Sequence, residues 1–188
     1  MDVITVQHLS KRFGAVTVVD GISFTVTAGE IVGFLGPNGA GKTTTLAMLL
    51  GLLLPTSGEV RVLDLAMPAE RQRILARVNF TSPYVALPGN LTVNENLTVF
   101  ALLYGVRDPE ARIGGLLDRF GLAPMRRRPT GRLSSGESTR LGLVKALLND
   151  PEVLLLDEPT ASLDPDSAER VRESLRAIRA ERRMTLLR

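Results

Sequence analysis

A stretch of small residues that ends in a lysine and a threonine carries the groups needed to hold a chain of phosphates. Residues 36–43 read Gly-Pro-Asn-Gly-Ala-Gly-Lys-Thr and fit the phosphate-loop pattern of Gly, four free positions and Gly-Lys-Ser/Thr. Glycines let the backbone close around phosphate oxygens, so that its N–H groups can donate to them. We expect Lys42 to reach the β- and γ-phosphates and Thr43 to offer its hydroxyl to Mg²⁺. The expected phosphate-contacting residues are Gly36, Pro37, Asn38, Gly39, Ala40, Gly41, Lys42, Thr43 and Thr44.

The flanks of this stretch are those of a loop between a strand and a helix. Residues 31–35 form a short apolar run, typical of a buried parallel strand, and residues 44–50 carry a helical pattern that stops at Gly51. The unpaired N–H groups and the positive dipole end of such a helix face the loop. The motif with these flanks predicts nucleotide binding; the alternative is a glycine-rich turn without a ligand.

Two carboxylates follow the most apolar run of the second half of the chain, residues 153–156. They are Asp157 and Glu158. An acid at the end of a buried strand near a phosphate loop can hold the hydration shell of Mg²⁺, and we expect this of Asp157. Glu158 points elsewhere, because successive strand residues face opposite sides. The alternative is that the two acids cap a helix or are simply solvated.

Length and composition indicate one globular domain. The chain has 188 residues, of which 44% are hydrophobic and 23% charged, enough for a sizeable core and an inserted subdomain. It contains no cysteine, which excludes disulfides and thiolate metal sites. The net charge of +3 is spread among nearly as many acids, so a nucleic-acid-binding stripe is not indicated. We expect the densest basic patch, residues 126–128, to be a solvated surface.

The sequence offers no segment that we expect to cross a membrane. Its longest apolar run, residues 46–54, has about half of the ~20 residues that a membrane helix needs. No basic region followed by an apolar one is visible after Met1, so we expect no secretory signal.

Alternating and β-branched runs predict strands around the phosphate loop. Residues 3–7 are expected to form an edge strand, followed by two strand-like runs at 16–19 and 22–27. The later strands are expected at residues 59–63, 77–80, 153–156 and 184–187. A short helix is expected over residues 69–76, with Pro68 as its first residue.

Between residues 81 and 132 strand signals are few and helix caps are clear. Thr92 with Glu95 makes a capping box for a helix to about residue 104, and Asp108-Pro109 starts another to about residue 120. A long helix is expected after residues 133–137, and Asp164 with a following proline starts a last exposed helix. The fold class is therefore α/β, with a mostly parallel sheet, an N-terminal antiparallel β region and a helical insertion.

Several motifs in one order resemble the ATP-binding subunit of an ABC transporter, and the resemblance covers nearly the whole chain. They lie at residues 9–14, 35–39, 55–58, 91–97, 133–137 and 157–165. The resemblance implies a P-loop NTPase fold in a single domain, with a nucleotide-binding core of about 1–83 and 133–188 and a helical subdomain of about 84–132. It implies ATP and Mg²⁺ as ligands and ATP hydrolysis that powers transport, more in the manner of exporters than of importers.

The resemblance also implies partners and a location. Two ATP-binding subunits form a head-to-tail dimer with two ATPs between them, and an integral membrane permease completes the transporter. The subunit is then cytoplasmic, at the inner face of the cell membrane, with no nucleic-acid partner.

By the same resemblance, further residues acquire roles. Glu158 becomes the general base for the attacking water, and Phe13 stacks on adenine, where the alternative is a packing residue. Asp164 belongs to the loop that links the two ATP sites, although it also makes a good helix cap. The residues that close on the γ-phosphate of the partner's ATP are Ser134, Ser135, Gly136 and Glu137.

The chain departs from the family pattern at the motif of residues 133–137. Ser135, Gly136 and Glu137 stand where the usual form has Gly-Gly-Gln. Ser135 adds a Cβ, and Glu137 brings a negative charge near an anionic ligand. We expect these changes to be tolerated.

Two further departures affect hydrolysis and coupling. Thr81-Ser82-Pro83 replaces a Gln that ligates Mg²⁺ and senses the permease, so we expect Ser82 to be a weaker ligand and residues 84–90 to build the partner groove differently. The switch histidine of the family would lie beyond Arg188, and the only histidine is His8, expected on the surface. We interpret the chain as ending short of that switch and expect it to bind MgATP but to hydrolyse it poorly.

Two other functions remain open at this point. An ABC-type ATPase can act on ribosomes or DNA, although such proteins usually carry two cassettes or a long coiled coil, which this chain lacks. The chain could also be a nucleotide-binding subunit that does not hydrolyse ATP; the missing Gln and His favour this, and Asp157-Glu158 argues against it.

Overall fold

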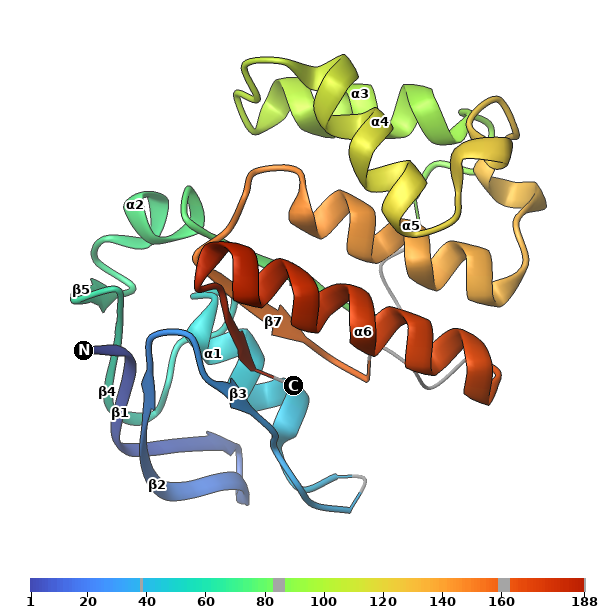
Figure 1. Cartoon of the computed structure of the whole chain (residues 1–188). Helices are drawn as coiled ribbons and strands as arrows, with labels where there is room; N and C mark the ends of the chain where they lie inside the picture. Colours follow the sequence, from blue (N-terminus) through green and yellow to red (C-terminus); the bar gives the residue numbers. More distant parts are fainter. Residues whose placement is uncertain (38, 83–86, 159–162, 188) are drawn as a thin grey trace.

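The computed structural model describes residues 1–37, 39–82, 87–158 and 163–187 (Figure 1). The strands are β1 (Asp2–Phe13), β2 (Val16–Thr27), β3 (Ile31–Val32), β4 (Ser57–Val62), β5 (Leu65–Met67), β6 (Val78–Thr81), β7 (Val153–Leu156) and β8 (Thr185–Leu187). The α-helices are α1 (Lys42–Leu49), α2 (Arg71–Leu75), α3 (Val93–Leu103), α4 (Pro109–Arg119), α5 (Ser135–Leu147) and α6 (Pro165–Arg182). Two short 3₁₀ helices, η1 (Ala123–Met125) and η2 (Thr130–Arg132), lie between α4 and α5.

The first sheet is antiparallel, with the strand order β2-β1-β4-β5. The expectation that residues 3–7 form an edge strand is wrong, because Val6 pairs with Phe24 of β2 on one side and with Val60 of β4 on the other. The runs at 16–19 and 22–27 are one strand rather than two. Gly21, at φ 58°, and shifts in the β1–β2 pairing let the strand continue through a turn-like dipeptide.

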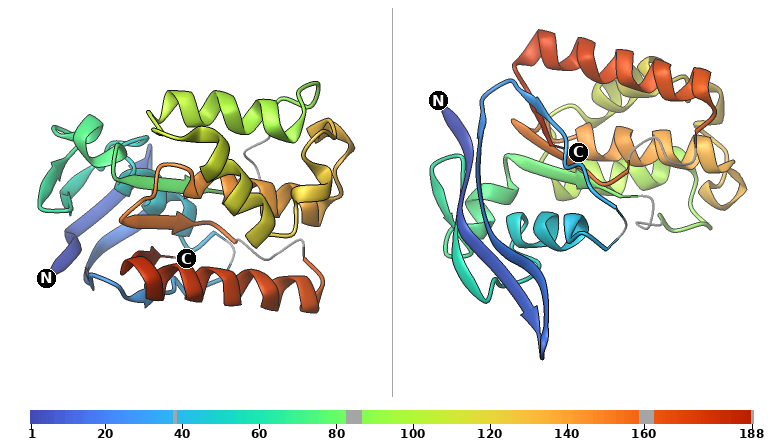
Figure 2. Two further views of the ribbon diagram at one scale, coloured as in Figure 1. Left: turned by 45° about the horizontal axis from the view of Figure 1, so that its top comes forward. Right: turned by 90° about the horizontal axis from the view of Figure 1, so that it is seen from below.

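The second sheet is parallel, with the strand order β3-β8-β7-β6. All of β7 is buried, and its side chains alternate between two cores. Leu154 and Leu156 pack with α5 and α6, whereas Val153 and Leu155 pack with α1 and the antiparallel sheet. Figure 2 shows this layering, with α6 and α1 on opposite sides of the parallel strands. Each fully buried leucine contributes about 1.5–3 kcal/mol, so the strand that ends at Asp157 is held firmly from both faces.

The strand before the phosphate loop is shorter than expected. Only Ile31 and Val32 pair, with Leu186 and Leu187 of β8. Beyond them no strand among the described residues lies against Phe34 and Leu35, and Leu35 is 98% exposed. The expectation of a buried strand through residue 35 is therefore wrong, because the partner strand β8 reaches only as far as Leu187.

Residues 93–132 form the helical part, which packs on α5 (Figure 1). Its helices begin where the caps predict: Thr92 and Glu95 form a reciprocal capping box, and the Asp108 carboxylate accepts the Ala111 N–H. Pro68, in contrast, is not in a first helical turn, because α2 starts only at Arg71. The boundaries of the core and of a helical subdomain remain a prediction.

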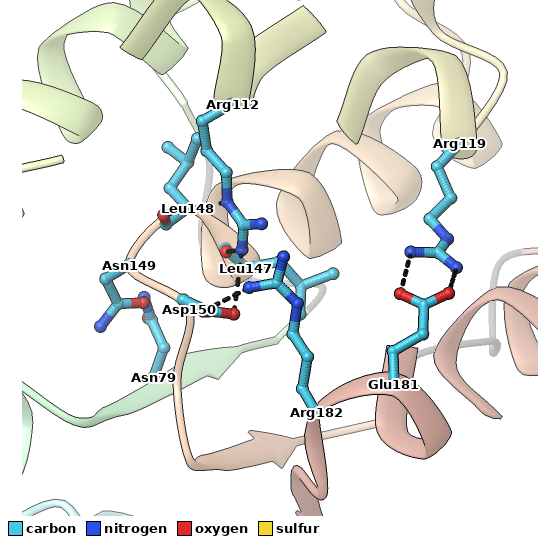
Figure 3. Close-up of polar contacts among 9 residues, drawn as sticks. All are labelled: Asn79, Arg112, Arg119, Leu147, Leu148, Asn149, Asp150, Glu181 and Arg182. Carbon is cyan, nitrogen blue, oxygen red and sulfur yellow. Dashed lines mark hydrogen bonds and ion pairs between the residues drawn. The ribbon is translucent and has the colours of Figure 1, made fainter. Parts of the chain in front are cut away.

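Two arginines of α4 fasten the helical part to the core (Figure 3). Arg112 donates to the Leu147 carbonyl at 2.5 Å and pairs with Asp150 at 3.3 Å. Arg119 forms a two-pronged ion pair with Glu181 near the end of α6. The first turn of α4 is thereby tied to the C-terminal end of α5, and the last turn of α4 to the C-terminal end of α6. No helix in the described part of the chain combines the length and apolar character needed to cross a bilayer.

Candidate nucleotide-binding site

The turn into α1 can be built only with glycine. Gly41 caps the helix at φ 81°, and a Cβ there would lie 2.7 Å from the Val18 carbonyl oxygen and 2.9 Å from Val19 Cγ2. Gly39 also has a positive φ, 84°, but a Cβ there would meet nothing within 4 Å. The two glycines serve different needs: close approach to β2 at Gly41, and backbone conformation alone at Gly39.

Lys42 folds back over the loop. Its Nζ donates to the carbonyl oxygens of Gly36 at 2.6 Å and Pro37 at 3.1 Å. The Ala40 N–H also donates to the Pro37 carbonyl, at 3.2 Å, which closes the turn. An ammonium has three donors. The charge of Lys42 is therefore held at the loop, with donor capacity left for an anion.

The central contact of the site joins the loop to the end of β7. The Thr43 hydroxyl donates to Asp157 Oδ2 at 3.1 Å, although 114 positions separate the two residues. Asp157 is only 6% exposed, and its backbone N–H donates to the Thr81 carbonyl of β6 at 3.0 Å. The register of the β6–β7 pairing thus fixes where the Asp157 carboxylate lies relative to Thr43 in the first turn of α1.

These residues fit a magnesium ion. A hydroxyl and a carboxylate that converge are hard oxygen donors, and Mg²⁺ typically takes one or two protein oxygens together with phosphates and water. Among the described residues, no three His, Cys, Asp or Glu side chains cluster as a self-sufficient metal site. The arrangement therefore suits a metal that arrives with a phosphate ligand.

Glu158 differs from its neighbour in conformation and exposure. It has a left-handed φ of 47°, uncommon for a residue other than Gly, Asn or Asp, and is exposed where Asp157 is buried. The two neighbouring carboxylates therefore lie in different surroundings, one buried and one exposed to solvent. Strained backbone of this kind is concentrated at functional sites.

The start of α5 holds a second group of the expected site residues. Ser134 and Glu137 cap the helix reciprocally: the Ser134 N–H donates to Glu137 Oε2 at 2.7 Å, and the Glu137 N–H donates to Ser134 Oγ at 3.2 Å. The bond from the Ser134 N–H lowers the pKa of Glu137, and Arg128 adds to this effect. A Cβ on Gly136 would lie 3.3 Å from Leu163 Cδ2, so the glycine allows Leu163 to pack there.

The two sites do not meet within the chain. Figure 1 places the start of α5 well apart from the start of α1. The motif of residues 134–137 thus lies apart from the phosphate loop of its own chain, and Ser134 and Ser135 are exposed, so that a second molecule can reach them.

A family model described as ABC transporter matches residues 19–161. The chain belongs to the ABC transporter family.

Two curated proteins that are similar to this ABC chain have the same name. The Nod factor export ATP-binding protein I of Ralstonia nicotianae is 41% identical over 189 residues, which cover 98% of this chain and 58% of that protein. The protein of the same name from Burkholderia lata is 42% identical over 183 residues, covering 96% and 60%. The chain thus spans about three fifths of the length of the curated relatives it matches.

Solved structures agree on the fold. The ATP-binding subunit of an ABC transporter superposes with a TM-score of 0.88 at 28% identity, covering 98% of this chain and 78% of that one. The ATP-binding cassette MJ0796, a dimer bound to ADP and Pi, gives 0.89 at 24% identity, covering 98% and 86%. The ABC chain therefore has the P-loop NTPase fold expected from its motifs.

Several expected site residues of the ABC chain lie at the ends of other elements or outside the described residues. Phe13 ends β1 and is 51% exposed, with Lys11 Nζ 5.0 Å from its ring centre. Asp164 caps α6 by accepting the Ser167 N–H. Asn38 and residues 83–86 and 159–162, which include part of the expected partner groove and of the loop between ATP sites, lie outside the described residues.

Some contacts of the site were not expected from the sequence. Val18 and Val19 of β2 touch the loop at Gly41, which only the folded position of β2 reveals. Arg127 and Arg128 are exposed, as expected of a solvated patch, but Arg128 also pairs with Glu137 at 3.5 Å and Arg126 pairs with Glu110. Ser134 with Glu137 three residues later is the sequence pattern of a capping box, so this contact could have been predicted. No sequence pattern predicts the contact between Arg128 and Glu137.

Proposed function

We propose that this chain binds MgATP at residues 36–43 and hydrolyses it between two subunits, and that this drives export through an integral membrane permease. The observation that carries the proposal is the 3.1 Å contact between Thr43 and Asp157, which joins the phosphate loop to the acid at the end of β7. Membership of the ABC transporter family supports it.

In this proposal the loop binds the triphosphate. The loop N–H groups and Lys42 hold the β- and γ-phosphates, and their charges stabilise the negative charge that develops on the γ-phosphate. Thr43 and Asp157 hold Mg²⁺, which when bound neutralises phosphate charge. Phe13 stacks on the adenine, and its exposed ring has a face available for this.

The hydrolytic step is assigned to Glu158. Its carboxylate accepts a proton from a water whose oxygen bonds to the γ-phosphorus, while the bond from that phosphorus to the β–γ bridging oxygen breaks and ADP leaves. The difference in backbone conformation and exposure between Asp157 and Glu158 supports separate tasks for the two acids, one on the metal and one on the water.

The second subunit completes the site. Ser134 Oγ accepts the Glu137 N–H, and its hydroxyl also hydrogen-bonds the Glu137 carboxylate. In the proposed dimer this hydroxyl turns to donate to the γ-phosphate of ATP bound to the partner. The start of α5 adds N–H groups and a positive dipole end. Two ATPs held in this way close a head-to-tail dimer, and hydrolysis opens it.

The membrane partner and the direction of transport rest on the relatives. Those described above are named for Nod factor export, which supports export rather than import and a place at the cytoplasmic face of the membrane. Thr81 and Ser82 occupy the place of the family's Gln, which favours the alternative of a subunit that binds ATP without hydrolysing it. Copurification with a membrane protein rather than with nucleic acid separates the transporter from the ribosome- or DNA-directed ATPase.

Single-turnover hydrolysis tests the proposal. The chain is mixed with a small amount of radiolabelled MgATP, and phosphate release is compared between the parent and Glu158→Gln. Loss of a general base is expected to slow release by about 10²–10⁴-fold with MgATP affinity retained. No release from the parent, with tight binding, would establish the non-hydrolysing alternative; equal rates would remove Glu158 from the mechanism.

A further inference from the structure

The guanidinium of Arg128 lies beside Glu137, the one acidic residue of the motif at residues 133–137. Arg128 Nη1 is 3.5 Å from Glu137 Oε1. The Glu137 side chain is 14% exposed and that of Arg128 is 44% exposed, so the carboxylate is largely shielded and the guanidinium partly so. Pairs with one shielded partner are less screened by salt than fully exposed ones.

Glu137 needs such a neighbour because of where its charge lies. Its carboxylate is fixed by the Ser134 N–H at the start of α5, one residue beyond the glycine that the proposed function places at a partner's γ-phosphate. A carboxylate stabilises a helix start but repels a triphosphate brought to it. A guanidinium on the carboxylate offsets that repulsion while leaving the cap in place.

The position of Arg128 is set by the backbone. The Arg128 carbonyl accepts the Val93 N–H at the start of α3, at 3.0 Å, and its neighbour Pro129 bridges to Thr92. The buried Asn96 amide and Thr130 hydroxyl fix the same junction from beneath. Arg128 is therefore held between the first turn of α3 and the first turn of α5.

We propose that Arg128 is a positioning residue for the composite ATP site: acting through Glu137, it keeps the Ser134 cap in place and cancels the carboxylate charge toward the partner's triphosphate. This inference rests on the proposed function. If the inference is right, Glu137 and Arg128 act as a pair. Replacing Arg128 then affects ATP-driven dimerisation only while residue 137 carries a charge.

The test is a double-mutant cycle on ATP-driven dimerisation. The full chain carries Glu158→Gln throughout, so that ATP is not consumed, and dimer formation is followed by sedimentation velocity as MgATP is raised. Arg128→Gln is expected to raise the half-saturating ATP concentration about fivefold. In a background that also carries Glu137→Gln, Arg128→Gln is expected to change the half-saturating ATP concentration by less than about twofold.

Three controls separate positioning from folding. Arg127→Gln removes the same charge from a neighbour for which no ion pair is found in the described part of the chain, and it should leave dimerisation unchanged. Arg128→Lys keeps the charge and should restore most of the parent behaviour. MgATP affinity of the monomer should be unaffected by Arg128→Gln, which a folding defect would not allow.

An equal loss from Arg128→Gln with and without the Glu137→Gln substitution would overturn the inference, as would failure of Arg128→Lys to rescue. Absence of any MgATP-dependent dimer in the parent is a different result, because it contradicts the proposed function itself.

Discussion

Neutralising Asp157 should have opposite consequences for the free protein and for the MgATP complex. Asp157→Asn keeps the shape of the side chain, and the amide oxygen can still accept the Thr43 hydroxyl that lies 3.1 Å away. The residue is 6% exposed, so the substitution also removes a charge from a poorly solvated place. We expect the unfolding free energy of the nucleotide-free chain to change by less than about 1 kcal/mol in either direction.

The effect on the complex is larger. A ligand at 100 times its dissociation constant stabilises the folded state by about 2.7 kcal/mol. For a chain of this size that corresponds to a rise of about 5–10 °C in the melting temperature. Without the carboxylate that holds the metal, the rise caused by Mg²⁺ with a non-hydrolysable ATP analogue should fall to that of the analogue with EDTA.

Thermal denaturation with and without Mg²⁺ provides the assay. Asp166→Asn is the matched control, because Asp166 is an exposed acid in the first turn of α6, and it should retain the full rise with Mg²⁺. The reasoning is refuted if Asp157→Asn gains as much as the parent from Mg²⁺ and the analogue together. It is also refuted if the nucleotide-free variant is destabilised by several kcal/mol, since Asp157 would then serve the fold rather than the metal.

Three further predictions concern the loop and the base-stacking residue. Lys42→Ala should weaken MgATP binding about 100-fold or more, because the charge pair between the ammonium and the phosphates is lost, and calorimetric titration with an unchanged affinity would contradict this. Gly41→Ala should destabilise the chain by about 2 kcal/mol or more, and Gly39→Ala by only about 1 kcal/mol, since only the first Cβ meets backbone atoms; equal urea midpoints would be inconsistent with the loop geometry. Phe13→Ala should weaken ATP binding about tenfold while Phe13→Tyr retains it, as measured by fluorescence competition, and equal affinities would remove the stacking role.

Elements with a local signal were predicted well. The capping residues Thr92, Asp108 and Asp164 correctly predicted the starts of α3, α4 and α6. A cap depends only on a side chain and an N–H two or three residues later, so it can be recognised from local sequence alone. The apolar run before Asp157 likewise located β7. The motif order was enough to predict the fold class.

Elements that depend on distant neighbours were predicted less well. Whether residues 3–7 lie at an edge or in the middle of a sheet is decided by β4, more than 50 positions away, and not by their own alternation. The three-residue β5 exists because Leu65–Met67 can pair back onto β4. Leu35 belongs to an apolar run, yet its burial depends on a neighbouring strand that the described residues do not supply.

The site shows the same division. The types and spacing of Lys42, Thr43 and Asp157 predicted a common task, but their convergence depends on the pairing of β6 with β7. Arg128 beside Glu137 had no local signal, because the two residues are brought together by the packing of the start of α3 against α5.

A crystal structure of the full chain with Mg²⁺ and a non-hydrolysable ATP analogue tests the central claim most directly. The account predicts the triphosphate within residues 36–43, with the metal on Thr43 Oγ1 and no more than one water from Asp157. A triphosphate bound elsewhere, or a metal on Thr43 that lies further from Asp157 than one bridging water, would contradict it.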